Sequence, residues 1–139
     1  MLNWLKSKPQ ESKTLGQIGE EIAQQEYKKK GFKIIAKNEY NKKGRRLGEI
    51  DFIVANKYQI IFVEVKTRKS EQGLFGTALE AVDVYKQRKI LKAVKLYMLH
   101  ATANRHLQPQ IDVCAVILGG VDKASESVKI YPSVVEDWN

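Results

Sequence analysis

The chain carries the stretch Phe62-Val63-Glu64-Val65-Lys66-Thr67-Arg68, in which a carboxylate and an ammonium stand two residues apart within an apolar, β-branched run. Thirteen residues before Glu64 lies Asp51, within the stretch Gly48-Glu49-Ile50-Asp51-Phe52-Ile53-Val54. Both stretches have the composition of β-strands, and a strand presents alternate residues on one face. Glu64 and Lys66 are therefore predicted to share a face, and the same rule pairs Asp51 with the residue two positions before it.

The connection around Asn56-Lys57 decides whether these charges meet. A two- or four-residue turn would put Glu49, Asp51, Glu64 and Lys66 on one face, whereas a three-residue turn would separate the two pairs. An acidic cluster beside a lysine suits metal-assisted phosphodiester cleavage, because carboxylates hold a hard divalent cation and the lysine orients a water or stabilises phosphate charge. The other interpretation is a half-exposed sheet with cross-strand ion pairs, such as Glu49 with Lys66.

The composition indicates one domain in a reducing compartment. The chain has 139 residues and a single cysteine, Cys114, which cannot form an intrachain disulfide and is predicted to be a buried structural thiol. No apolar stretch approaches the roughly 20 residues that cross a bilayer. We therefore expect a cytoplasmic protein without a membrane partner, with residues 1–13 as a flexible leader and residues 14–139 as one domain.

The positive charge is concentrated in one segment. Residues 28–46 hold nine of the 24 basic residues and one of the 16 acidic residues, so this segment accounts for the whole net charge of +8. Such a local field indicates a polyanionic partner, for which nucleic acid is the leading candidate. A solvated basic surface kept for solubility is the other interpretation, and no basic amphipathic helix with large apolar anchors favours a lipid surface here.

The periodicity predicts a mixed α/β domain with a central sheet, in the order α-β-β-β-α-β-β. Thr14-Leu15-Gly16-Gln17 has the pattern of a capping box that opens the first helix, and Gly31 after three lysines ends it. A helical turn is expected at Thr77–Val82 and a long helix from Asp83 to about Ala101. The predicted strands are Phe32–Ala36, Gly48–Ala55, Tyr58–Arg68, Gln110–Leu118 and Val128–Tyr131.

The first helix supplies a second acidic candidate, Glu20. It stands beside Gly16 and Ala23, whose small size would let the helix approach the sheet closely, so Glu20 could face the acidic end of the sheet. The alternative is an ordinary exposed helical glutamate. Asp51, Glu64, Lys66 and Glu20 are thus the candidate catalytic residues.

The order of these motifs resembles the YraN-like bacterial proteins, a family of predicted endonucleases related to archaeal Holliday-junction resolvases, within the PD-(D/E)xK nuclease superfamily. The resemblance runs across most of the chain. Its motifs are Gly16-Gln17-Ile18-Gly19-Glu20-Glu21-Ile22-Ala23, Gly31-Phe32, Asn38, Gly48-Glu49-Ile50-Asp51, Phe62–Arg68, Gly76, Ala81-Val82, Lys86, Ala93 and Tyr97.

The resemblance implies a restriction-endonuclease-like fold, with a central mixed sheet flanked by helices, and a magnesium- or manganese-dependent endonuclease acting on DNA. Asp51, Glu64 and the Val65 carbonyl would hold the metal, Lys66 would assist the attacking water, and Glu20 would complete the acidic site. The predicted nucleic-acid contacts are Lys42, Lys43, Arg45, Arg46, Arg68 and Lys86.

Two departures from the family pattern affect substrate contacts. Glu39-Tyr40 stand where the family usually has an arginine, and Gln110 stands two positions before Asp112 where the family tends to have another. A homodimer is favoured if two strands are cut symmetrically. A nucleic-acid-binding protein that keeps the fold without cleaving, and a structural protein whose hairpin carries surface ion pairs, are the alternatives.

Overall fold

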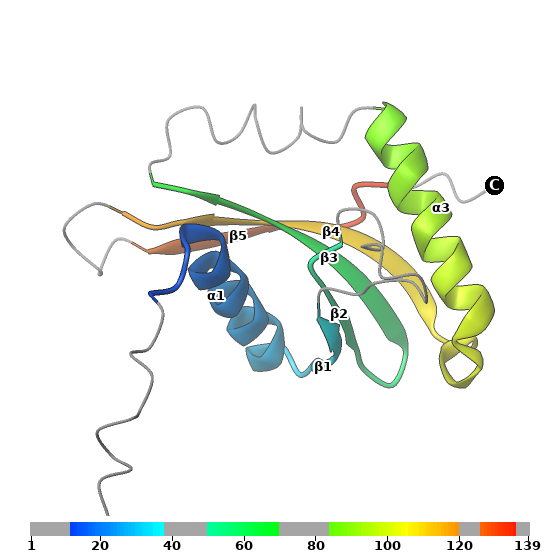
Figure 1. Ribbon diagram of the computed structural model, residues 1–139. Coiled ribbons are helices and arrows are strands. Elements are labelled where there is room, and N and C mark those ends of the chain that lie inside the picture. The colour runs from blue at the N-terminus through cyan, green and yellow to red at the C-terminus, as the bar shows by residue number, and fades with distance from the viewer. Residues whose placement is uncertain (1–11, 38–49, 70–83, 120–125, 136–139) are drawn as a thin grey trace, which may run out of the picture.

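The structure, a computed structural model, describes residues 12–37, 50–69, 84–119 and 126–135, and for residues 84–86 the backbone alone. A five-stranded sheet in the order β1-β2-β3-β4-β5 forms its centre (Figure 1). Neighbouring strands are antiparallel except β3 and β4, which are parallel and are joined through a helical crossover. The strands are β1 (Lys33–Lys37), β2 (Phe52–Ala55), β3 (Gln59–Arg68), β4 (Gln108–Ile117) and β5 (Ser127–Tyr131).

Helices cover the two faces of the sheet. Helix α1 (Leu15–Lys29) lies on one face, helix α3 (Val84–His100) lies on the other, and a short 3-10 helix η2 (Thr102–Asn104) leads from α3 into β4 (Figure 1). The predicted mixed α/β class and the predicted order of elements are confirmed. The expected turn at Thr77–Val82 and residues 1–11 of the expected leader at residues 1–13 lie outside the described residues.

Each face has its own apolar core. Tyr27 of α1 packs with Phe52 and Val63, whereas Ile90 and Val94 of α3 pack in the cluster that contains Phe62. Each core contains an edge-to-face pair of aromatic rings, which stabilises it. The ring centroids of Phe62 and Tyr97 lie 5.4 Å apart and those of Tyr27 and Phe52 lie 5.7 Å apart, with the ring planes nearly perpendicular in both pairs. Neither described helix has the length and apolarity that crossing a bilayer would require.

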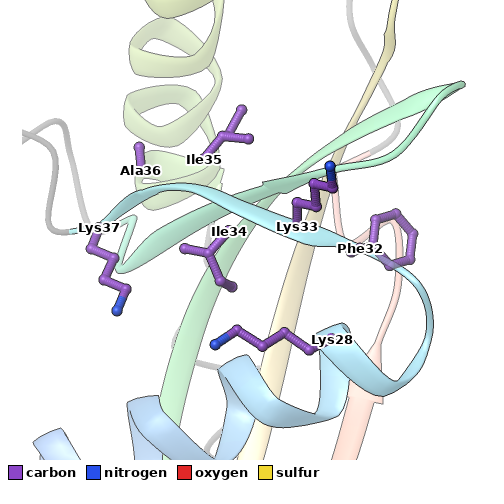
Figure 2. Close-up of a pocket in the computed structure, with 7 residues that line it drawn as sticks. All are labelled: Lys28, Phe32, Lys33, Ile34, Ile35, Ala36 and Lys37. Carbon is purple, nitrogen blue, oxygen red and sulfur yellow. The ribbon is translucent and has the colours of Figure 1, made fainter.

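Strand β1 forms one edge of the sheet and carries an irregularity. Its register with β2 shifts between Ile34 and Ala36, which inserts Ile35 as an extra residue. In Figure 2, Ile34 points toward α1, while Ile35 and Ala36 lie on the other side of the strand. Ile35 is 41% exposed, so this edge presents an apolar side chain to solvent between two lysines.

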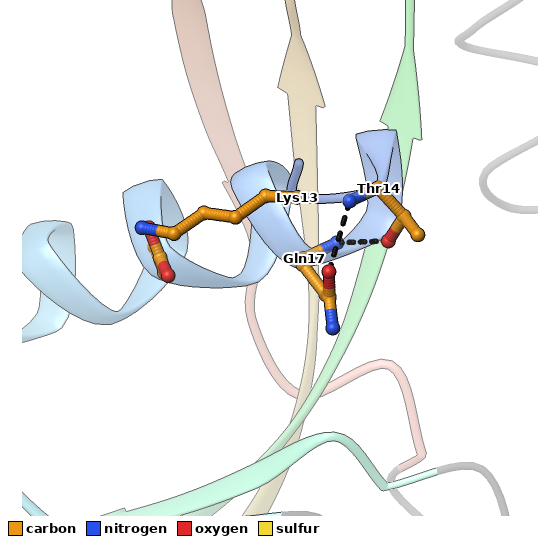
Figure 3. Close-up of polar contacts among 4 residues, drawn as sticks. Lys13, Thr14 and Gln17 are labelled. Carbon is orange, nitrogen blue, oxygen red and sulfur yellow. Dashed lines mark hydrogen bonds and ion pairs between the residues drawn. The ribbon is translucent and has the colours of Figure 1, made fainter. Parts of the chain in front are cut away.

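The ends of α1 follow the predicted signals. The Thr14 hydroxyl accepts a hydrogen bond from the Gln17 N–H at 3.2 Å, and the Gln17 side chain accepts from the Thr14 N–H at 2.9 Å, which completes the capping box (Figure 3). Gly31, just past the helix, has a φ of 93°, which glycine adopts without strain. The predicted capping box at the start of α1 and the predicted glycine at its C-terminal end are therefore confirmed.

The buried stripe of α1 differs from the one that apolar residues alone would suggest. Gly19, Ala23 and Tyr27 are buried, whereas Leu15 is 37% exposed. A Cβ on Gly19 would lie 2.9 Å from the Cβ of Thr67 on β3, so only glycine fits there. A Cβ on Gly16, by contrast, would meet only the Thr14 hydroxyl at 4.0 Å, an ordinary van der Waals contact. Close approach of the helix to the sheet therefore depends on Gly19 and Ala23.

Candidate active site

Strand β3 brings Glu64 and Lys66 onto one face. They share this face with Phe62 and thus lie on the α3 side of the sheet. The Lys66 ammonium forms an ion pair with Glu64 Oε1 at 2.8 Å, and the two side chains are 19% and 4% exposed. The predicted sharing of a face is confirmed, and the lysine lies beside the glutamate of its own strand.

The connection between β2 and β3 has the even parity that would place the charges on one face of an uninterrupted ladder. Ala55 pairs with Ile60, so four residues form the turn. The side-chain oxygen of Asn56 accepts hydrogen bonds from the N–H groups of Tyr58 at 2.9 Å and Gln59 at 2.8 Å, which fixes the turn. The sequence allowed two, three or four residues at this point, and the structure selects four.

Asp51 lies just before β2, in a backbone irregularity. Its N–H donates to the Val63 carbonyl at 2.9 Å, although Val63 already pairs with Phe52. Two consecutive residues thus oppose one, as in a β-bulge. Ile50 and Ile53 both enter the α3-side core, although regular alternation would put them on opposite faces. The prediction of an unbroken strand from Gly48 is therefore wrong at residues 50 and 51, because the bulge interrupts the ladder.

The bulge directs the Asp51 carboxylate at β3. Asp51 Oδ2 accepts a hydrogen bond from the Val65 N–H at 2.7 Å, and Val65 lies between Glu64 and Lys66. Asp51 is 6% exposed and Glu64 is 3% exposed, so the two carboxylates reach the same short segment of β3 in a largely water-excluded setting. Only the tertiary structure supplies this contact.

The oxygen atoms at this position form a donor set suited to a hard divalent cation. Main-chain N–H and C=O groups of one strand residue point to the same side, so the Val65 carbonyl is directed to the side on which Asp51 lies. Two carboxylates and a carbonyl match the preference of magnesium, which keeps several waters and binds few protein ligands. Two formal negative charges against one from Lys66 also favour an additional cation.

Glu20 lies in a different setting. It lines a hollow at the start of α1 together with Gln17, Gln24 and Lys37, and α1 packs on the face opposite Glu64. Within the described ranges, no group of three or more His, Cys, Asp or Glu residues gathers where it could hold a metal. The part of Glu20 in the acidic site remains a prediction.

The predicted nucleic-acid contacts are only partly described. Lys42, Lys43, Arg45 and Arg46 lie outside the described residues. Arg68 is exposed at the end of β3, and its guanidinium donates to the Thr67 carbonyl at 2.9 Å. Lys86 lies in the first turn of α3, where the description covers its backbone.

Asp112 forms a buried cluster that sequence reasoning did not identify. It is 1% exposed and accepts hydrogen bonds from Tyr27 at 2.7 Å, from Gln110 at 2.8 Å and from the Ser133 N–H at 3.2 Å. Gln110 thus contacts the carboxylate at the position where the resemblance leads one to expect an arginine. The available signal was weak: a tyrosine on the small-residue stripe of α1 and an aspartate within an apolar strand.

Burial changes the proton affinity of two groups near Asp112. Desolvation raises the pKa of Tyr27 well above its usual range, and the charge and hydrogen bond of Asp112 raise it further. Burial raises the pKa of the Cys114 thiol to about 12, with smaller contributions from the charges of Glu26 and Asp112. Cys114 is fully buried, so the expected structural thiol is confirmed.

Comparison with known proteins identifies relatives whose activity is not named. The sequence profile described as "Uncharacterised protein family UPF0102" matches residues 19–116, and the chain belongs to this family. A UPF0102 protein of Caldanaerobacter subterraneus subsp. tengcongensis is 46% identical over 76% of this chain and 81% of its own length. UPF0102 proteins of Syntrophotalea carbinolica and Clostridium botulinum (strain Kyoto / Type A2) are 40% and 38% identical, covering 90% of this chain and 95% and 96% of their own lengths.

Proposed function

We propose that this member of UPF0102 is a divalent-metal-dependent endonuclease of the PD-(D/E)xK type, which hydrolyses phosphodiester bonds in nucleic acid, with DNA as the preferred substrate. One observation carries the proposal: Asp51, held by the bulge, reaches the β3 residue between Glu64 and Lys66. Burying two carboxylates and an ammonium costs free energy, so this arrangement is expected only where it serves the function or the structure of the protein.

The residues take distinct roles in this proposal. Asp51, Glu64 and the Val65 carbonyl would hold Mg²⁺ or Mn²⁺, and the bound ion would lower the pKa of a water and offset charge on the scissile phosphate. Lys66 positions the attacking water or a phosphate oxygen. Glu64 orients the Lys66 ammonium through their 2.8 Å contact, and the Val65 N–H fixes the rotamer of Asp51 through its hydrogen bond.

A nucleic-acid-binding protein that does not cleave is the second candidate. It is favoured by the concentration of the net charge of +8 in residues 28–46, which attracts a polyanion whether or not the protein cleaves it. The two candidates differ in one respect that can be measured directly. An endonuclease binds Mn²⁺ at Asp51 and Glu64, whereas a pure binder gains nothing from carboxylates that would repel phosphate.

The test uses purified full-length protein with Mg²⁺ or Mn²⁺ on linear duplex, single-stranded and four-way-junction DNA. We expect cleavage of at least one substrate, and none in EDTA. Lys66→Ala should lower the cleavage rate by about 10²-fold or more, the scale on which a positioned proton-handling or orienting group acts. It should keep Mn²⁺ binding, because lysine is not a ligand in the proposed site.

The matched control is Lys92→Ala, which removes one positive charge from the exposed side of α3. It should cleave at the unmodified rate. A Lys66→Ala protein that cleaves as fast as this control would overturn the role of Lys66. Absence of Mn²⁺ binding in the unmodified protein would instead favour the non-catalytic candidate.

A further inference from the structure

A groove made of two adjoining hollows runs along the β1 edge and reaches the β2–β3 turn. Its first part, of about 620 Å³, lies beside β1 and is bordered by Lys28 of α1 (Figure 2). Its second part, of about 690 Å³, lies between β1, the turn that holds Tyr58, and the segment that contains His106. Both parts are lined by Lys33 and Ile35, so they adjoin one another at the β1 edge.

The lining of this groove is basic. Its charged residues are the lysines at positions 28, 33, 37 and 57, and no aspartate or glutamate lines either part. Within the described residues, none of these four lysines has a carboxylate partner. Figure 2 shows Lys33 on one side of β1 and Lys37 on the other, so positive charge flanks the edge from both faces. A polyanionic chain laid along β1 would meet ammonium groups on both sides.

One end of the groove carries an exposed aromatic ring. Tyr58 is 71% exposed, and the Lys57 ammonium lies 5.9 Å from its ring centre. A lone exposed tyrosine needs no explanation, but a tyrosine at the end of a groove whose charged lining residues are all lysines matches the combination that binds single-stranded nucleic acid. Such proteins stack unpaired bases on aromatic rings while lysines follow the backbone.

The groove leads from Tyr58 toward the candidate active site. Lys33 pairs with Ala55 near the turn, and Lys37 pairs with Phe52, the residue after Asp51. Tyr58 itself lies about 20 Å from Glu64 along β3, at the usual rise per strand residue. A nucleic-acid strand that stacks on Tyr58 and lies along β1 would therefore reach the position of Asp51.

We propose that this groove binds a single-stranded segment of nucleic acid, with Tyr58 as a base-stacking platform and the β1 lysines as phosphate contacts. The inference rests on the proposed function and names its substrate class: nucleic acid with an unpaired portion next to the cleaved bond. An acidic extended peptide is disfavoured, because the bulge at Ile35 breaks the regular row of backbone groups that strand addition requires.

Binding is measured without cleavage, by fluorescence anisotropy of full-length protein with a labelled oligothymidylate in EDTA. Tyr58→Ala should weaken binding by about tenfold, because one stacked base is lost. Tyr58→Phe should bind within about twofold of the unmodified protein, because the ring that stacks is retained. Binding to blunt duplex DNA should not change in either variant, since no base is unpaired.

A charge-matched pair of variants tests the lysines. Lys33→Ala with Lys37→Ala should reduce the magnitude of the slope of log K against log salt by about 1.4, because each lost contact with single-stranded phosphate removes about 0.7. Lys92→Ala with Lys95→Ala removes the same charge from the exposed side of α3 and should change the slope by less than half as much.

Several outcomes would contradict the proposal that the groove binds single-stranded nucleic acid. Unchanged oligothymidylate affinity in Tyr58→Ala, an equal slope change in both double variants, or polyglutamate that competes as well as oligothymidylate would each do so. The last result would assign the surface to an acidic peptide. The two proposals can be distinguished. If binding depends on Tyr58 but no metal-dependent cleavage occurs, only the endonuclease proposal is rejected. If cleavage occurs but binding does not depend on Tyr58, only the proposed binding of a single strand in the groove is rejected.

Discussion

Two regions of the sheet bury carboxylates in different ways. On the α1 side, Asp112 accepts hydrogen bonds from a phenol, an amide and a main-chain N–H. At the β2–β3 bulge, Asp51 accepts a hydrogen bond from the Val65 N–H, and the neighbouring Glu64 forms an ion pair with Lys66. The first arrangement satisfies one charge with three donors, and the second concentrates charge. Burial alone therefore does not indicate function, and the nature of the partners does.

The Asp112 cluster has the features of a structural device. It joins α1 to β4 and to the segment after β5, where Ser133 has a φ of 53°, uncommon for a residue other than glycine. Its donors match the acceptor capacity of one carboxylate. Asp51 and Glu64 instead bring two formal negative charges to one short segment of β3, where like charges repel.

Neutralising one aspartate in each region tests the difference between the two regions most directly. Asp51→Asn should lower metal-dependent cleavage by about 10²-fold or more and weaken Mn²⁺ binding, because a charged ligand is lost. Asp112→Asn should cleave at nearly the unmodified rate at temperatures where it stays folded. Rates and Mn²⁺ titrations on both proteins decide this, and equal losses in the two variants would remove the functional distinction.

Stability should show the reverse ranking. Asp112→Ala should lower the free energy of unfolding by about 3 kcal/mol or more, because three buried donors lose their acceptor. Asp51→Ala should cost less than about 1 kcal/mol in EDTA, or raise stability, because relief of repulsion offsets the lost hydrogen bond to Val65. Urea unfolding with and without Mg²⁺ measures both effects.

Addition of the metal provides the control for this ranking. Mg²⁺ should stabilise the unmodified protein and Asp112→Ala, but not Asp51→Ala, since ligand binding to the folded state alone shifts stability by mass action. A metal-independent Asp51→Ala defect larger than that of Asp112→Ala would show that Asp51 is the structural residue of the two.

The α1 side should also be sensitive to close packing. Gly19→Ala should destabilise by about 1–3 kcal/mol, because its methyl group would overlap the Thr67 side chain on β3. Gly16→Ala, on the same helix and with room for a methyl group, should be neutral or stabilising by up to about 1 kcal/mol. Thermal unfolding of the two variants compares them, and equal melting temperatures would show that α1 can move away from the sheet at no cost.

The smallest effect is expected at alkaline pH, also on the α1 side. Tyr27 and Cys114 have raised pKa values and stay protonated in the folded protein where the unfolded chain ionises. The folded state then binds more protons, so stability falls as the pH rises above about 9 for the thiol and above about 10 for the phenol. Each group contributes up to about 1.4 kcal/mol per pH unit in that range.

Tyr27→Phe tests this alkaline limb. The variant should be less stable than the unmodified protein at neutral pH, because it loses the hydrogen bond to Asp112. Between about pH 9.5 and about pH 11, the range around the usual tyrosine pKa of about 10, it should lose less additional stability than the unmodified protein does. Urea unfolding across this range gives the two slopes, and parallel slopes would contradict the assignment.

The order of elements and the position of charge along each strand follow from local signals in the sequence. The capping box, the terminal glycine and the period of two in β3 are local signals, so the bounds of α1 and the shared face of Glu64 and Lys66 could be predicted. Family membership adds that these motifs occur together in related proteins. It names no activity, so function still depends on the chemistry of the site.

The contacts that the buried carboxylates make depend on the packing of segments that are distant in the sequence. The bulge that directs Asp51 at Val65 depends on which residues of β2 pair with β3, and the buried role of Asp112 depends on α1 delivering Tyr27 from 85 positions away. The edge position of β1, which exposes its lysines, follows from the order of all five strands. Periodicity reports only neighbours within one element, whereas these features arise between elements that fold together from distant parts of the chain.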